Sequence, residues 1–350
     1  MLGLLSGACA VIYTRHSRPP PPAELESASS AASELAALKE LFGVRDAAPG
    51  PPLPPPRPPD DMPPFSYRAA SLQFNASSLA YCDPPLLHPG LTFGGLTVTA
   101  SLHSSALTDI HLLVGYYASG DVQLAFRGSK SAANFALDLQ AQLAALQLTR
   151  KQVEVAGCSD CKVHSGFQEG VASVLPQVKA ALAEAVSLAP ESSSRTLLVA
   201  GHSLGGALSS LAAFTLASSS SLSAFSRVAV TTFGTPRVGN LAFASAYNEV
   251  LPDTIRVVNG GDTVPHTPLE ALGYYHEGVE VWFPRPGASK SYATCSTEAE
   301  SDERCSGSLV GSATLFTPWT ELNALTNLDA EDHNYRWTFA PGSKVSDCPA

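Results

Sequence analysis

The chain has 350 residues, of which 45% are hydrophobic and 15% charged, and its net charge is −10. This composition excludes a chain that is disordered throughout, because disorder requires low hydrophobicity and high net charge. It disfavours nucleic-acid binding, which usually shows a basic stripe, and binding to an anionic membrane through charge alone. No apolar run reaches the ~18 residues of a membrane span.

Residues 1–18 form the first segment of distinct composition. An apolar run contains Ala8-Cys9-Ala10, which has the small-x-small form of a signal cleavage site, although Arg15 and Arg18 follow the run instead of preceding it. We interpret this segment as a signal peptide or a signal anchor. The alternative is an apolar N-terminus without targeting value.

Residues 19–64 form a second segment, which contains 14 of the 28 prolines. Proline runs favour an extended polyproline conformation and remove backbone donors, so this segment is interpreted as a proline-rich linker or pro-segment. Within it, the spacing of apolar residues predicts one amphipathic helix over Ser33 to Phe42, either as a pro-segment helix or as a weakly helical linker.

From about residue 65 onward, strand-like and helix-like segments alternate, which favours an α/β fold whose sheet is covered on both faces. We therefore predict one domain over residues 65–350. The expected strands are Ile110–Tyr117, Val122–Arg127, Thr196–Ala200, Val228–Phe233, Thr254–Val258 and Val279–Trp282, and the expected helices are Val171–Leu188 and Leu204–Ala217.

The most specific motif is Gly201-His202-Ser203-Leu204-Gly205, which lies between a predicted strand and a predicted helix. A nucleophile elbow needs this context, because a tight turn exposes the serine hydroxyl above the sheet and the helix N-terminus favours developing negative charge. Ser203 is therefore the candidate nucleophile. The alternative is a glycine-rich turn with an inert serine.

A serine nucleophile needs a base and a carboxylate that orients the base, and in α/β-hydrolases both follow the serine in the chain. Asp262 follows the predicted strand Thr254–Val258 in a glycine turn and is the candidate acid, or else a turn aspartate that bonds its own backbone. The base is His333 or His276. His266 lies between two prolines and is too constrained.

These motifs occur together in an order that resembles the secreted fungal lipases of class three, from about Tyr81 to Cys348. The resemblance implies an α/β-hydrolase fold with a mostly parallel sheet, assigns the base to His333, and makes His276 structural. The blocks that carry it are Phe126-Arg127-Gly128-Ser129, Val163-His164-Ser165-Gly166-Phe167, Thr232 to Asn240, Asp262-Thr263-Val264-Pro265-His266 and Asp332-His333-Asn334-Tyr335.

The resemblance also implies an activity, which is carboxylic ester hydrolysis through an acyl-enzyme. The backbone N–H groups of Ser129 and Leu204 are implied to form the oxyanion hole. No metal or organic cofactor is needed. The substrate is expected to be a lipid or ester at an interface, with triacylglycerol lipase favoured, a feruloyl or other soluble carboxylesterase as the alternative, and a non-catalytic binding protein as a minor one. No dedicated protein partner is implied.

Cysteine usage favours an exported protein. Apart from Cys9 the chain contains six cysteines, an even number that suggests disulfides but allows fifteen pairings. The family resemblance implies Cys82–Cys348, Cys158–Cys161 and Cys295–Cys305. Asn75-Ala76-Ser77 is a glycosylation sequon that matters only after export. We expect a secreted protein or, if the leader is an anchor, a lumenal one.

The segment that follows Ser129 is the candidate lid. The family usually has a tryptophan where Phe135 stands, and the segment is unusually rich in alanine, which leaves the lid and the substrate range open. If Asn134–Leu148 is a helix, its apolar stripe could meet a lipid surface or could simply face the core. That stripe consists of Phe135, Leu139, Leu143 and Leu146.

Overall fold

The structure is a computed structural model that describes residues 65–83, 86–104, 109–129, 143–285, 290–295, 305–309 and 331–334, together with residues 337, 339 and 348. The predicted leader, the proline-rich segment and the helix expected over Ser33 to Phe42 lie outside the described residues. The domain boundary at residue 65 stays a prediction.

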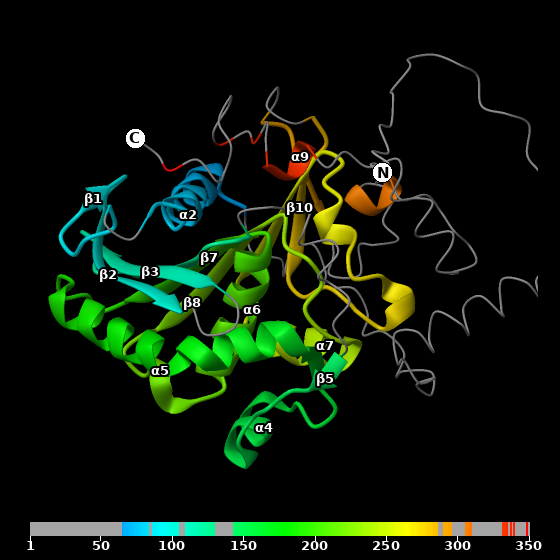
Figure 1. Cartoon of the computed structure of the whole chain (residues 1–350), viewed down its shortest axis with the longest axis horizontal. Helices are drawn as coiled ribbons and strands as arrows, with labels where there is room; N and C mark the ends of the chain where they lie inside the picture. Colours follow the sequence, from blue (N-terminus) through cyan, green and yellow to red (C-terminus); the bar gives the residue numbers. More distant parts are fainter. Residues whose placement is uncertain are drawn as a thin grey trace, which may run out of the picture.

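A sheet of nine strands forms the centre of the described chain, in the order β1-β2-β3-β4-β7-β8-β9-β10-β11 (Figure 1). The strands from β4 to β10 are parallel to one another, whereas the pairs at either end of the sheet are antiparallel. The bounds are β1 (Thr92–Phe93), β2 (Leu96–Ser104), β3 (Ile110–Tyr117), β4 (Val122–Phe126), β7 (Thr196–His202), β8 (Arg227–Phe233), β9 (Thr254–Asn259), β10 (Val279–Phe283) and β11 (Ala293–Cys295).

Alternating side chains of the strands build a separate core on each face of this sheet. In β4, Leu124 and Phe126 belong to the larger core, and Ala125 between them belongs to a smaller core on the other face. This follows from the two-residue period of a strand. The central strands are buried on both faces, as a sheet covered by helices requires.

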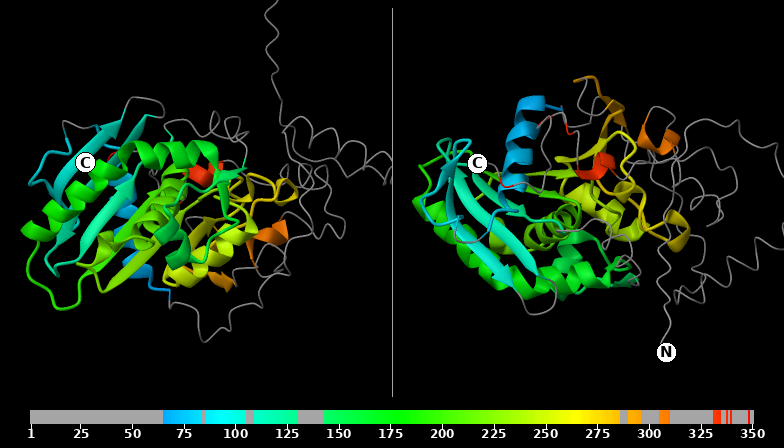
Figure 2. Two further views of the ribbon diagram at one scale, coloured as in Figure 1. Left: turned by 90° about the horizontal axis from the view of Figure 1, so that it is seen from below. Right: turned by 45° about the horizontal axis from the view of Figure 1, so that its top comes forward.

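Helices cover both faces of the sheet. The helix α2 (Tyr67–Leu79) lies on one face, and α5 (Ser165–Leu188), α6 (Leu204–Ala217) and α7 (Leu241–Val250) lie on the other (Figures 1 and 2). The predicted α/β fold with both faces covered is therefore confirmed. The remaining short elements are α4 (Arg150–Ala156), α9 (Glu331–Asn334) and the 3-10 turns η2 (Ser220–Leu222), η3 (Val264–His266), η4 (Glu270–Leu272) and η6 (Ser306–Leu309).

The helix α5 begins six residues before the predicted start at Val171, because His164 caps it: the His164 Nδ1 atom accepts a hydrogen bond from the Phe167 N–H. Among the described residues, α5 is the one helix that is long and apolar enough to cross a membrane by length and composition. Its buried side, with Val174 and Val178, packs in the main core against the sheet and α6, so the fold accounts for its apolar face.

The helix over Asn134–Leu148 on which the predicted apolar stripe depended is not formed in the described part of this range. Leu143–Ala145 form the strand β5, which pairs antiparallel with β6 (Lys162–His164). The side chain of Leu146 packs against the main core. Leu143 and Leu146 therefore do not belong to a lid helix, because pairing with β6 and burial fix them to the body of the domain.

Three disulfides join the cysteine pairs that the family resemblance implied: Cys82–Cys348, Cys158–Cys161 and Cys295–Cys305. The first joins residues 266 positions apart and ties the segment after α2 to residue 348. It therefore closes a loop that contains almost the whole domain.

Candidate active site

The carboxyl ends of four neighbouring strands lie at one edge of the sheet. Phe126 of β4 is level with Gly201 of β7, His202 of β7 is level with Phe233 of β8, and Phe233 is level with Val257 of β9. Side chains that follow these strands therefore converge, as they do at the ligand-binding edge of open α/β sheets. Within three residues after the ends of these four strands come, in order, Ser129, Ser203, Gly234 and Asp262.

Ser203 occupies a strained turn between β7 and α6. Its backbone has φ 58° and ψ −131°, a conformation that residues other than glycine rarely adopt. The Ser203 N–H donates a hydrogen bond of 2.9 Å to the carbonyl oxygen of Phe233 in the next strand, which helps to hold this conformation. The predicted nucleophile elbow is thus present in its expected strand–turn–helix context.

The glycines of the elbow are required by close backbone approach. A Cβ atom on Gly201 would overlap the backbone of Gly205, and one on Gly205 would lie 2.7 Å from the Arg127 carbonyl carbon. Any side chain at these positions would push β7, α6 and the segment after β4 apart. Ser203 is positioned by this contact between three backbone segments.

Asp262 and His333 form a buried pair beside the elbow. Both carboxylate oxygens of Asp262 lie 2.9 Å from Nδ1 of His333, and the two side chains are 0% and 1% exposed. Asp262 Oδ1 also accepts a hydrogen bond from the Val264 N–H, so the aspartate bonds its own turn as well as the histidine. Because a carboxylate can only accept, Nδ1 of His333 carries the proton of this hydrogen bond, which leaves Nε2 as the ring nitrogen that can accept a proton in the neutral form.

The helix α9 holds His333 over the sheet edge through its neighbour in the chain. Oδ2 of Asp332 accepts a hydrogen bond of 2.9 Å from the Gly261 N–H, and the Asn259 amide donates one of 2.8 Å to the Asp332 carbonyl. The loop that carries Asp262 is thus tied to the helix that carries His333, and the two partners are aligned through their backbones.

Two atoms of the site are buried and lack a hydrogen-bond partner among the described residues: Oγ of Ser203 and Nε2 of His333. These two atoms are therefore not hydrogen-bonded to each other in the structure, and such a bond is often long in a free site and tightens only when substrate binds. Ser203 also precedes the first residue of α6, so the positive end of the helix dipole faces its hydroxyl.

The predicted oxyanion residues flank Ser203. Leu204 is the first residue of α6, where helix geometry leaves the N–H without an intrahelical acceptor. Gly128, next to Ser129, is so close that a Cβ on it would lie 3.1 Å from the Ser203 Cβ. Both predicted oxyanion residues thus lie next to Ser203 or next to a residue that contacts it, and their role stays a prediction.

The other two histidine candidates, His276 and His266, make hydrogen bonds within the segment that follows Asp262. His276 is buried, and its Nε2 lies 2.6 Å from the Pro265 carbonyl oxygen, to which it donates. His266 ends η3, and Arg237 donates hydrogen bonds to its carbonyl and to that of Pro268. The prediction that His276 is structural agrees with this contact.

Sequence reasoning did not find a layer of polar residues behind the triad. Oη of Tyr81 lies 2.9 Å from Nδ1 of His202, and Nε2 of His202 lies 2.8 Å from the His333 carbonyl oxygen. The Trp337 indole N–H donates to the same oxygen at 3.0 Å. The only sequence signal was the histidine inside the elbow motif, because Tyr81 stands outside any motif.

His202 is electrically neutral in this position. Its burial and the nearby positive charge that His333 can carry lower its pKa well below the ordinary value. The centroid of its ring lies 4.5 Å from that of the His333 ring, with the two rings tilted by 33°, so a positive charge on both would be strongly unfavourable.

The remaining predicted site residues lie elsewhere. Phe135 and Leu139, the other two lid candidates, lie outside the described residues. Asn75 is partly exposed in the middle of α2, and Ser77 of the same sequon is completely buried, with its hydroxyl bonded to the Gln73 carbonyl. Glycosylation of Asn75 stays a prediction, and it would have to precede the packing of α2.

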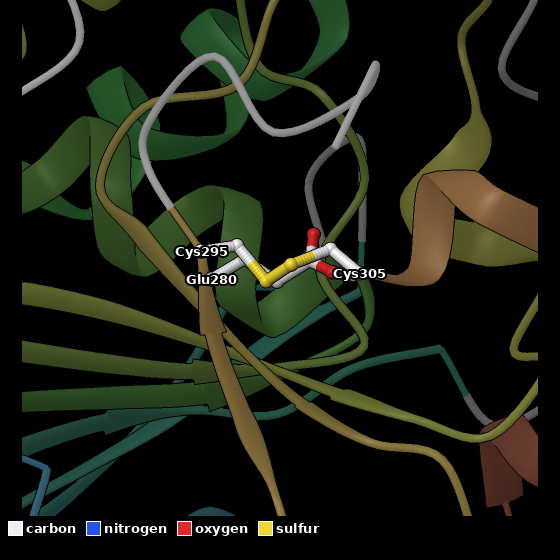
Figure 3. A group of neighbouring side chains, drawn as sticks. All are labelled: Glu280, Cys295 and Cys305. Atoms are coloured by element: carbon white, nitrogen blue, oxygen red, sulfur yellow. A yellow bond between two sulfur atoms is a disulfide. The ribbon is translucent and has the colours of Figure 1, made fainter. Parts of the chain in front are cut away.

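Three residues of types that can bind a metal ion lie close together at β10, but their side chains already form a disulfide, a hydrogen bond and an ion pair within the protein. Glu280, Cys295 and Cys305 place their ligand atoms within 4.8 Å of one another, and Figure 3 shows the two sulfurs joined as a disulfide. One Glu280 oxygen accepts from the Ser306 N–H and the other pairs with Arg256 at 3.5 Å. The cluster fastens the disulfide segment to the sheet.

The sheet order and the strand–turn–helix arrangement at Ser203 together define an α/β-hydrolase fold. Comparison with solved structures agrees on the fold. Rhizomucor miehei triacylglyceride lipase superposes with a TM-score of 0.63 and 23% identity over 84% of this chain and 99% of that one. A triacylglycerol lipase described as having a serine protease triad as its catalytic centre gives 0.60 and 24%, over 80% and 96% of the two chains.

Residues 123–272 match the family described as lipase (class 3). A lipase of Rhizomucor miehei is 32% identical over 189 residues, which are 54% of this chain and 48% of that protein. Secreted mono- and diacylglycerol lipase 1 of Fusarium solani is 32% identical over 160 residues, 45% of each chain. The chain thus spans about half the length of these relatives, and its predicted resemblance to the class 3 lipases is confirmed.

Proposed function

We propose that the protein is a carboxylic ester hydrolase that acts as a triacylglycerol lipase. One observation carries the proposal: His333 is held by Asp262 at 2.9 Å, at the same sheet edge as the strained Ser203, and its Nε2 is left free. In this account Ser203 is the nucleophile, His333 the general base and Asp262 the group that orients the base.

The reaction follows from the proton positions. Nε2 of His333 takes the hydroxyl proton of Ser203 while Oγ attacks the ester carbonyl carbon, and the carbonyl electrons move to oxygen. The ester C–O bond then breaks, the proton passes from His333 to the leaving alcohol, and Ser203 stays acylated. Water, deprotonated by His333, attacks the acyl-enzyme, and the proton returns to Ser203 as the carboxylic acid leaves.

Backbone donors stabilise the intermediate of both steps. The N–H groups of Leu204 and Ser129 bind the oxyanion, and Asp262 stabilises the positive charge that His333 acquires. The neighbouring His202 stays neutral, so the imidazolium meets no second positive charge from it.

The substrate class is supported by the relatives. Three of the matched proteins are named as a lipase, a mono- and diacylglycerol lipase and a triacylglyceride lipase, which favours acylglycerols. A feruloyl or other soluble carboxylesterase remains the alternative, since the same triad serves both. A lid formed by Phe135 and Leu139 stays a prediction.

Export is part of the proposal. The three disulfides need an oxidising compartment to persist, and the Fusarium solani relative is named as secreted. We propose a secreted protein, with a lumenal protein held by its N-terminal segment as the alternative.

Hydrolysis of emulsified long-chain triglyceride, compared with hydrolysis of methyl ferulate, tests the substrate class. Faster release of fatty acid supports the lipase, and faster cleavage of methyl ferulate favours the esterase. A serine-reactive phosphonate separates both from a non-catalytic binding protein, because only an activated Ser203 should react.

A further inference from the structure

We propose that Tyr81 and His202 are positioning residues that hold the base His333 by its backbone and link it to the oxyanion segment. The inference rests on the proposed function and names residues that act through His333 rather than on the substrate. Its basis is a set of two hydrogen bonds from Tyr81 through His202 to His333, in which each donor can be assigned, together with the close contact of Tyr81 with Gly128.

Which group donates in each of these hydrogen bonds follows from the carbonyl oxygen of His333, where the set ends. The His333 carbonyl can only accept, so His202 must donate to it from Nε2, at 2.8 Å. A neutral imidazole has a single N–H, so Nδ1 of His202 is unprotonated and accepts from the Tyr81 hydroxyl at 2.9 Å. The Tyr81 oxygen also lies directly against the Gly128 backbone, because a Cβ atom on Gly128 would overlap it.

Burial makes this assignment stable. Tyr81 is 7% exposed and His202 is 1% exposed, so neither finds water as a substitute partner. Burial raises the pKa of Tyr81 and lowers that of His202, so both stay neutral, in the forms that the hydrogen bonds need.

The geometry connects the two halves of the catalytic site. Gly128 precedes the predicted oxyanion residue Ser129, and a Cβ on Gly128 would overlap both Tyr81 Oη and the His202 carbonyl. Tyr81 therefore fixes where the oxyanion segment lies, and His202 fixes where the His333 backbone lies. Because His202 directly precedes Ser203, the same two residues align base, nucleophile and oxyanion donors.

The first test is Tyr81→Phe, which removes the hydroxyl and keeps the ring. With a soluble short-chain ester, kcat should fall about tenfold while KM changes less than about twofold, since the lost bond orients the base and does not touch substrate. The matched control is Tyr247→Phe, another buried tyrosine, whose hydroxyl accepts a hydrogen bond from Thr254. It should lower thermal stability and leave kcat unchanged.

The second test is rescue at position 202. The amide of His202→Gln can still donate to the His333 carbonyl, whereas His202→Leu cannot. The glutamine variant should therefore keep a clearly higher kcat than the leucine variant. Equal activity of these two variants, or a Tyr81→Phe enzyme with the kcat of the wild type, would overturn the proposal.

The third test does not depend on activity or on the folding of a variant. Nitrogen NMR of the histidine-labelled wild-type protein should show His202 as the Nε2–H tautomer without titration between about pH 5 and 8. An Nδ1–H tautomer, or titration in that range, overturns the hydrogen-bond assignment. The proposed function fails separately, if the wild type neither cleaves esters nor reacts with the phosphonate.

Discussion

Gly234 lies directly against the carboxylate of Asp262: a Cβ atom on residue 234 would lie 2.5 Å from Asp262 Oδ2 and 2.9 Å from His333 Nδ1. Gly234 also has φ +55°, which glycine adopts without strain. The turn after β8 thus leaves just enough room for the Asp–His hydrogen bond.

Gly234→Ala should therefore damage catalysis more than stability. The added methyl group displaces Asp262 or His333, and we expect kcat to fall by about 10² or more, because misplacement of catalytic groups by ~1 Å costs that much. Gly157→Ala is the matched control: it has φ +62° and no atom within 4 Å of the added carbon, so it carries the backbone strain alone. Equal kcat for both variants would contradict the role of Gly234.

His333→Ala should mainly lower kcat, whereas His276→Ala should mainly lower the stability of the fold. Removing the base should lower kcat by at least about 10³ with a native fold. Removing His276 deletes its 2.6 Å bond to the Pro265 carbonyl and should cost about 1–3 kcal/mol of stability with near-native kcat. Ester kinetics and thermal unfolding of both variants measure this; exchanged outcomes would show that the base has been misassigned.

Much of the fold could be predicted because its signals are local. The helix Leu204–Ala217 has its predicted bounds, and the predicted strands agree with the structure to within two residues at either end. The triad candidates were accessible for the same reason, since Ser203, Asp262 and His333 each follow a recognisable element or motif in the chain order of α/β-hydrolases.

The features that sequence reasoning misassigned or missed have one physical cause: each depends on a contact between residues that are far apart in the chain. Leu143–Ala145 has an apolar spacing compatible with a helix, but pairing with Lys162–His164 makes it a strand. Tyr81 and His202 are 121 residues apart, so no local pattern could join them. The close approach of Gly234 to Asp262 likewise exists only once β8 and β9 lie side by side.

Acid should destabilise the fold partly through His164. Burial lowers its pKa from 6.5 to about 4, so below pH 6.5 the unfolded chain binds a proton that the folded chain does not. The stability that His164 contributes is thus complete above pH 6.5 and is lost as the pH falls toward 4, by about 2–3 kcal/mol. His164→Asn keeps a capping acceptor and removes the titration.

Denaturant unfolding of wild type and His164→Asn at pH 7 and pH 4.5 measures this contribution. The free energy of unfolding should decline less in the variant over this interval. If the two proteins lose the same amount, His164 titrates normally and the prediction fails.

The disulfide Cys82–Cys348 should stabilise the domain most. It closes a loop of 266 positions, against 3 for Cys158–Cys161, and the loop-entropy relation gives about 5.6 kcal/mol for the first and about 1.6 for the second. Replacing each pair by serine and comparing unfolding free energies measures the difference. A Cys82→Ser/Cys348→Ser protein as stable as the wild type would refute this ranking.

The central claim is that Ser203 attacks an ester of a lipid with the help of His333 and Asp262. The most direct measurement is the rate of fatty-acid release from emulsified long-chain triglyceride by the wild type and by Ser203→Ala, with melting curves for both. We predict hydrolysis by the wild type and less than about 1% of that rate in a variant with a native melting curve. Comparable release by a folded Ser203→Ala protein, or none by the wild type, would contradict it.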